Sequence, residues 1–136
     1  MFEILDHPSD IGVLARGRTR EEALLEASRG LTSIMVNTEG VGKTEERELH
    51  APGPDEAAQI VNWLNEILFF FDTESMIPVE FAIDSWSKDG IAGRAQGGFF
   101  DGSRHEFRTA VKAVTYHQFE SRPTADGWEI RVFVDV

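Results

Sequence analysis

An α+β fold is predicted by three features of this 136-residue sequence. Two segments repeat apolar residues at helical spacing, strand-like alternation dominates the second half, and the order is strands, helix, strand, helix and a run of strands. That order favours a two-layer arrangement, with two main helices packed on one face of a mainly antiparallel, mixed β-sheet. Hydrophobic residues make up 41% of the chain, including 10 Phe and 3 Trp. This content can fill one core, so we expect residues 1–136 to form a single domain.

Two short strands and a helix are predicted at the start of the chain. The strands, Phe2–Leu5 and Ile11–Gly17, flank Asp6–Asp10, whose Pro, Ser and Asp residues favour a turn. Thr19 followed by Glu22 forms a capping-box pattern, which predicts a helix start. The apolar positions of this helix are Leu24, Ala27, Leu31, Ile34 and Met35.

A second helix is predicted after the chain-breaking segment Pro52–Pro54. Asp55 and Glu56 stand where the helix N-terminus favours negative charge. Its broad apolar stripe consists of Ile60, Val61, Leu64, Ile67, Leu68 and Phe71. Between the helices, the charged segment Lys43–His50 is typical of an edge strand or a solvated hairpin arm.

Strand patterns account for most of the remaining chain. A turn at Lys88–Gly90 separates two of the strands. The predicted strands are Val79–Trp86, Ile91–Gly97, Thr109–Phe119 and Gly127–Val136.

The composition excludes several classes of protein. The formal net charge is −11, and all of the acidic excess lies in residues 1–87. Such a surface repels phosphate backbones, so we expect no strong direct binding of nucleic acid and instead a basic protein partner or a cation. Absent cysteine excludes thiolate sites. The longest apolar run, Ile67–Phe71, is too short to span a bilayer, so we expect a cytoplasmic protein with no membrane attachment.

The last two strands place a lysine opposite a carboxylate. Putting the apolar positions of both strands on one face requires the numbers of paired residues to sum to an odd value. A sum of 247 puts Lys112 opposite Asp135 on the second face, whereas a neighbouring odd sum keeps them on the same face but not directly opposite. Directly opposed Cβ atoms lie about 4.5–5.5 Å apart, so the Lys112 ammonium can reach the Asp135 carboxylate. The same register pairs Val114 with Phe133 and Tyr116 with Arg131.

A cation site is one interpretation of this strand end. Asp135 precedes Val136, whose α-carboxylate adds a second anion, and pairing of an N-terminal strand would bring Asp10 to the same place. Three oxygen-bearing groups suit a hard cation such as Ca²⁺ or Mg²⁺. From the residues alone, the simpler interpretation is a salt bridge between Lys112 and a carboxylate, with Asp10 as an ordinary turn former.

Several segments together resemble the archease family. Asp6–Gly12 (Asp-His-Pro-Ser-Asp-Ile-Gly) is similar to the family's opening Asp/Glu-His-Thr-Ala-Asp-Ile/Val-Gly motif. The departures are Pro8 and Ser9, where the family usually has Thr and Ala, and Val134 and Val136, where Ile is common; they leave every expected ligand position intact. Further matches are Trp63–Leu68, Phe71–Glu74, Val111–His117, Gly127–Trp128 and Val134–Val136, so the resemblance covers essentially the whole chain.

The resemblance implies a non-enzymatic accessory protein of the RtcB class of RNA ligase, which joins RNA ends in tRNA splicing and repair with GTP and Mn²⁺. The family promotes guanylylation of the ligase histidine and multiple turnover, and is also proposed to modulate a tRNA methyltransferase as a chaperone-like partner. The family's metal-binding groups fall on Asp10, Asp135 and the main chain of Val136, and its essential lysine falls on Lys112. The implied cation is Ca²⁺, with Mg²⁺ or Mn²⁺ as alternatives.

An enzyme is the competing interpretation. A metal-dependent phosphoesterase or nuclease would use Asp10 and Asp135 as ligands and Lys112 or His105 as proton donor or phosphate clamp. The roles of several further residues are less defined. His117 is expected on the apolar face, His7 at the rim of the site, Trp63 and Phe69–Phe71 in the core, and Tyr116 has no assigned role.

Overall fold

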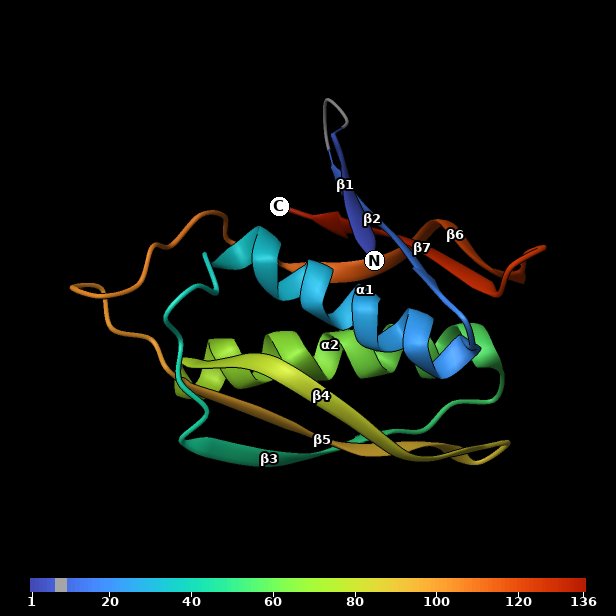
Figure 1. Ribbon diagram of the computed structural model, residues 1–136, viewed down its shortest axis with the longest axis horizontal. Helices are drawn as coiled ribbons and strands as arrows, with labels where there is room; N and C mark the ends of the chain where they lie inside the picture. The colour runs from blue at the N-terminus through green and yellow to red at the C-terminus, as the bar shows by residue number, and fades with distance from the viewer. Residues whose placement is uncertain (7–9) are drawn as a thin grey trace.

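The structure, a computed structural model, describes residues 1–6 and 10–136. Two helices lie between a four-stranded sheet of order β1-β2-β7-β6 and a three-stranded sheet of order β3-β5-β4 (Figure 1). The elements are β1 (Phe2–Asp6), β2 (Ile11–Gly17), α1 (Arg20–Met35), β3 (Glu45–Ala51), α2 (Glu56–Glu74), β4 (Met76–Ser87), β5 (Gly90–Phe99), β6 (Ala113–Pro123) and β7 (Trp128–Asp135).

Both helices begin where the sequence predicts. The Thr19 hydroxyl caps α1 by accepting a 3.1 Å hydrogen bond from the Glu22 backbone N–H. The Asp55 carboxylate caps α2 by accepting a 2.8 Å hydrogen bond from the Ala58 backbone N–H. Each cap satisfies an N–H group that the first helical turn leaves without a partner.

The α+β class, the two helices and the antiparallel strands are confirmed, but the layering differs from the expectation. The described strands form two sheets, all five pairings are antiparallel, and the helices are a middle layer. Helix α1 packs against β2 and β4, and α2 packs against β6, β3 and β4, so each helix touches both sheets. The apolar stripe of α2 is wide enough to be buried on two sides, which one sheet alone would not require.

The edge position of β3 is confirmed, whereas the predicted bounds of β6 are wrong. β6 begins at Ala113 rather than Thr109 and extends to Pro123. The residues before it form a loop that is held to the end of α1, where the Asn37 N–H donates to Glu106 O and the Arg108 N–H donates to Met35 O. Those backbone groups are therefore paired with α1 instead of with β7.

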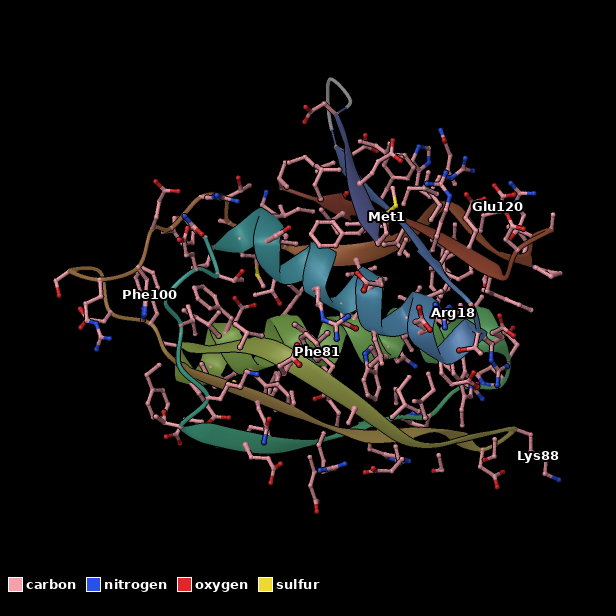
Figure 2. All side chains as sticks on the ribbon, in the orientation of Figure 1. Met1, Arg18, Phe81, Lys88, Phe100 and Glu120 are labelled. Carbon is pink, nitrogen blue, oxygen red and sulfur yellow. The ribbon has the colours of Figure 1, made fainter. Side chains whose placement is uncertain are left out.

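The core lies between the layers and includes most of the predicted aromatic residues. Trp63 is fully buried and its indole Nε1 donates a 2.9 Å hydrogen bond to Ser28 Oγ of α1. Phe70 is buried, but Phe69 is 55% exposed. Figure 2 shows Lys88 and Phe100 at opposite ends of the three-stranded sheet. No helix in the described part of the chain is long and apolar enough to cross a membrane.

Candidate functional site

Three neighbouring strands of the four-stranded sheet bring the predicted site residues to one place. β7 lies between β2 and β6 and pairs Ile11 with Val134 on one side and Ala113 with Asp135 on the other. Asp10 directly precedes Ile11, so the same antiparallel register places it opposite Asp135. Lys112 directly precedes Ala113, and its backbone N–H donates a 2.8 Å hydrogen bond to Asp135 O.

The predicted register of β6 and β7 is wrong by one residue at this end. Ala113, rather than Lys112, is the partner of Asp135, and no ion pair joins the Lys112 and Asp135 side chains in the described residues. The reason is burial: Val114 pairs with Val134, and both are buried, so they face the helices together. The link between Lys112 and Asp135 is therefore made by the backbone and leaves both side chains exposed.

A bulge in β6 accounts for the rest of the register error. Tyr116–Phe119, four residues, have no partner in β7, where only Val132 separates the partners of Thr115 and Glu120. Gln118 has a positive φ of 50°, which is uncommon for a residue other than glycine. Arg131, the predicted partner of Tyr116, pairs with Glu120, and its side-chain Nε donates to Gln118 O at 3.0 Å.

The bulge turns His117 out of the core, where the sequence placed it, and toward Asp10. Its side chain is 59% exposed, and its Nε2 atom lies 3.8 Å from Oδ2 of Asp10. Its ring also packs edge-on against Phe133, with 5.9 Å between ring centroids. His117 therefore joins the strand end, and its place in the Val111–His117 motif was the one sequence signal of such a role.

The far face of the sheet supports this arrangement through a glycine. Phe133 is buried although it points away from the helices, because its ring lies over Gly12 of β2. A Cβ atom at position 12 would come within 2.8 Å of that ring. Gly12 thus makes room for the Phe133 ring, against which the His117 ring packs.

The oxygen groups at this strand end are of the type that a hard divalent cation prefers, but they are too few to complete its coordination. The donors that the resemblance implies are the Asp10 and Asp135 carboxylates and the main-chain oxygen of Val136, which are of the types that Ca²⁺ and Mg²⁺ prefer. The described residues hold no group of three or more His, Cys, Asp or Glu side chains arranged around a metal position. Water or a partner's groups would have to complete the coordination.

The remaining candidates lie elsewhere or outside the described residues. His7 falls in the segment 7–9, outside the described residues. His105 belongs to the loop after β5, where its Nδ1 accepts a 3.0 Å hydrogen bond from the Asp101 N–H and its ring packs on Phe100. The Asp101 carboxylate also accepts hydrogen bonds from Ser103, which lower the pKa of Asp101. The His105 side chain therefore makes its contacts within its own loop.

Two of the larger hollows lie away from the strand end. One, of about 340 Å³, is on the outer face of the three-stranded sheet beside His50 and Arg94. Another, of about 330 Å³, lies at the start of α2 beside Trp86. The Trp86 ring stacks under Arg20 and donates to Gln59 there, so that hollow is lined by side chains already engaged in the fold.

Comparison with known proteins gives a consistent picture. Residues 2–136 match the Archease protein family (MTH1598/TM1083). Protein archease of Methanosarcina barkeri is 34% identical over 139 residues, covering 99% of this chain and 95% of the relative. Protein archease of Saccharolobus islandicus (strain M.14.25) is 36% identical over 137 residues, covering 99% of this chain and 98% of the relative.

Two solved structures share the fold. The solution structure of protein 1598 of Methanobacterium thermoautotrophicum matches with a TM-score of 0.82 and 31% identity, over 99% of this chain and 98% of that one. An archease of Thermotoga maritima, described as a possible chaperone, matches with a TM-score of 0.61 over 100% and 98% of the two chains, and at 20% identity it supports the fold alone. The resemblance carried by the sequence motifs is confirmed over essentially the full length, and the chain belongs to the archease family.

Proposed function

We propose that this chain activates an RtcB-class RNA ligase, promoting guanylylation of the ligase and its multiple turnover without being an enzyme itself. The observation that carries the proposal is the meeting of Asp10, Asp135 and Lys112 at adjacent ends of β2, β7 and β6. These are the positions at which the family resemblance implies metal ligands and an essential lysine.

The carboxylates and the lysine have complementary roles in this proposal. Asp10 and Asp135, with the main-chain oxygen of Val136, hold a divalent cation, Ca²⁺ first and Mg²⁺ or Mn²⁺ as alternatives. A cation held there supplies positive charge that offsets phosphate charge. The backbone of Lys112 is hydrogen-bonded to Asp135 and its side chain is exposed, so its ammonium is proposed to contact a phosphate oxygen directly.

His117 has a supporting role next to Asp10. The Asp10 side chain is only 15% exposed, and the imidazole covers one of its oxygens from the bulge. An aspartate restrained in this way presents its oxygens in a fixed direction, which favours ligand binding by reducing the loss of side-chain freedom.

The charge distribution supports a protein partner rather than RNA. With a net charge of −11, the surface attracts the cationic, phosphate-binding region of a ligase and repels RNA. We propose a tRNA methyltransferase as a second partner of the same surface, so that it would compete with the ligase for this chain.

A ligation assay at substrate excess tests the function. Adding this chain to the cognate ligase with GTP and Mn²⁺ is expected to raise product formation beyond the first turnover, and Asp10→Ala or Asp135→Ala is expected to abolish the increase. Asp84→Ala, on the outer face of the other sheet, is the matched control. Full stimulation by an Asp135→Ala protein with a normal melting curve would contradict the proposal.

The enzyme alternative is favoured by one observation, the 3.8 Å contact between the His117 imidazole and Asp10. A phosphoesterase could use such a pair for proton transfer. The chain alone is therefore assayed on phosphodiester and cyclic-phosphate substrates with Mg²⁺, Mn²⁺ or Ca²⁺. The proposed accessory role predicts no turnover, and metal-dependent turnover lost in Asp10→Ala would favour the enzyme.

A further inference from the structure

The start of β6 is fastened from outside its sheet by one side chain of α2. Asn65 Oδ1 accepts a 2.9 Å hydrogen bond from the Val114 N–H, and Asn65 Nδ2 donates to Val114 O at 3.3 Å. β6 is an edge strand, and the backbone groups of Val114 that Asn65 binds point away from β7. The Asn65 amide thus takes the place of a neighbouring strand at this residue.

This attachment matters because β6 is weakly held on its other side. Only Ala113, Val114 and Thr115 pair with β7 before the bulge at Tyr116–Phe119 interrupts the ladder. The chain before Ala113 is a loop, so the paired segment is short and bounded by irregular backbone on both sides. A three-residue pairing on an edge has few hydrogen bonds to prevent local opening.

Lys112 depends directly on this short segment. Its backbone N–H bonds to Asp135 O, which extends the pairing of Ala113 with Asp135 by one further bond. Lys112 lies two residues from Val114, so any movement of Val114 is passed to it along the backbone. The Asn65 side chain comes from a helix fixed between the sheets by buried Trp63 and Leu64, and it is therefore a firm anchor.

We infer that Asn65 is a positioning residue, which holds Lys112 beside Asp135 and Asp10 by clamping both backbone groups of Val114. Its effect on ligation rests on the proposed function, in which Lys112 acts at the ligase. The clamp itself does not depend on that function and has its own measurable consequence, the protection of the Lys112 amide from exchange.

Amide hydrogen exchange, followed by NMR on the full chain, tests the clamp. In Asn65→Ala, the amides of Val114 and Lys112 are expected to exchange at least tenfold faster, while the core amides of α1 and β5 keep their rates. Asn65→Asp keeps the acceptor for the Val114 N–H and loses the donor to Val114 O, so more protection should remain. If Asn65→Ala folds poorly, the amide exchange rates of Asn65→Asp test the clamp in its place.

Asn62 provides a matched control on the same helix. Its side-chain amide donates a 2.7 Å hydrogen bond to Pro52 O in a loop remote in sequence from β6. Asn62→Ala should leave the Val114 and Lys112 amides unchanged. An unchanged Lys112 amide in Asn65→Ala would overturn the inference, whatever the ligation result.

A double-mutant cycle in the ligation assay separates positioning from general structural support. If Asn65 acts through Lys112, Asn65→Ala reduces the stimulation of ligation at least fivefold in the natural chain. In a chain that already carries Lys112→Gln, Asn65→Ala then causes no further loss of the remaining stimulation. Equal effects of Asn65→Ala in both backgrounds would overturn the positioning role. If Lys112→Gln stimulates fully, the role of Lys112 at the ligase, and with it the positioning role of Asn65 in ligation, is overturned. If the natural chain gives no stimulation while the Val114 and Lys112 amides of Asn65→Ala exchange faster, the clamp stands and the proposed function fails.

Discussion

The two sheets use their charged side chains in different ways. On the three-stranded sheet, Arg94 lies 3.0 Å from Asp84 and 3.8 Å from Glu46, so its charge is matched within the sheet. On the four-stranded sheet, the side chains of Lys112 and Asp135 take part in no ion pair within the described residues. The difference is local, because the other end of the same sheet contains matched charges such as Arg122 and Glu129, at 2.8 Å.

The irregularities of the two sheets differ in size. In the three-stranded sheet β3 pairs with β5 without a shift and β4 skips single residues, between Pro78 and Glu80 and between Ile83 and Ser85. In the four-stranded sheet β6 loses its pairing with β7 over the four residues Tyr116–Phe119. Each matched surface charge contributes little to stability, but it already interacts with an opposite charge of the protein. At the strand end of β2, β7 and β6, the side chains of Lys112 and Asp135 are instead exposed. In the proposed function, the three-stranded sheet acts as scaffold and the four-stranded sheet carries the site.

The largest expected effect on stability comes from the core between the two sheets. Trp63→Ala removes a fully buried ring and its hydrogen bond to Ser28, so we expect a loss of about 3–5 kcal/mol in the free energy of unfolding. Lys112→Ala, at an exposed position, should change it by less than about 0.5 kcal/mol. Urea denaturation measures both, and a similar loss in the two variants would refute the division into scaffold and site.

An intermediate effect distinguishes glycines in the two sheets. A Cβ at position 97 would meet the Ile77 backbone carbonyl across β4 and β5, so Gly97→Ala should cost about 2–3 kcal/mol. A Cβ at position 12 would meet the Phe133 ring, a side chain that can tilt, and Gly12→Ala should cost about 1 kcal/mol. Thermal unfolding of both variants compares them, and a costlier Gly12→Ala would show that the four-stranded sheet is the more rigid one.

The smallest effect is a pH dependence of the scaffold's ion pairs. Hydrogen bonds from Arg47 lower the pKa of Glu74 in the folded state. The pair therefore stabilises the fold above the ordinary glutamate pKa, and this contribution is lost as the pH falls through the lowered value. Because both side chains reach solvent, Glu74→Gln should reduce the Tm slightly at pH 7 and by less at pH 3. A Tm difference that grows at pH 3 would contradict this sign.

Local signals in the sequence predict the helices and the individual strands well. Thr19 and Asp55 cap the helices as expected, and Ile11–Gly17 is a strand with the predicted bounds. The division into two sheets was not predictable, because strand partners are chosen by contacts between distant segments. The apolar pattern of α2 does not reveal that its two sides face different sheets.

The sequence predicts which residues meet at the candidate site, but it does not predict how they are arranged. Asp10, Asp135 and Lys112 are brought to adjacent strand ends, whereas the register between β6 and β7 differs from the predicted one. Alternation of apolar residues assumes an uninterrupted ladder, and the bulge breaks that assumption. His117 was misplaced for this reason, and the contact between Asn65 and Val114 has no signature in the sequence.

In the proposed function, the strand end of β2, β7 and β6 acts on the ligase, and the matched charges of the three-stranded sheet do not. The most direct measurement compares multiple-turnover stimulation of the ligase by the natural chain, Lys112→Ala and Arg94→Ala at substrate excess. Both variants lose one exposed cation, so bulk charge changes equally. We predict that Lys112→Ala loses stimulation while Arg94→Ala keeps it, whereas equal stimulation by both variants would contradict the account.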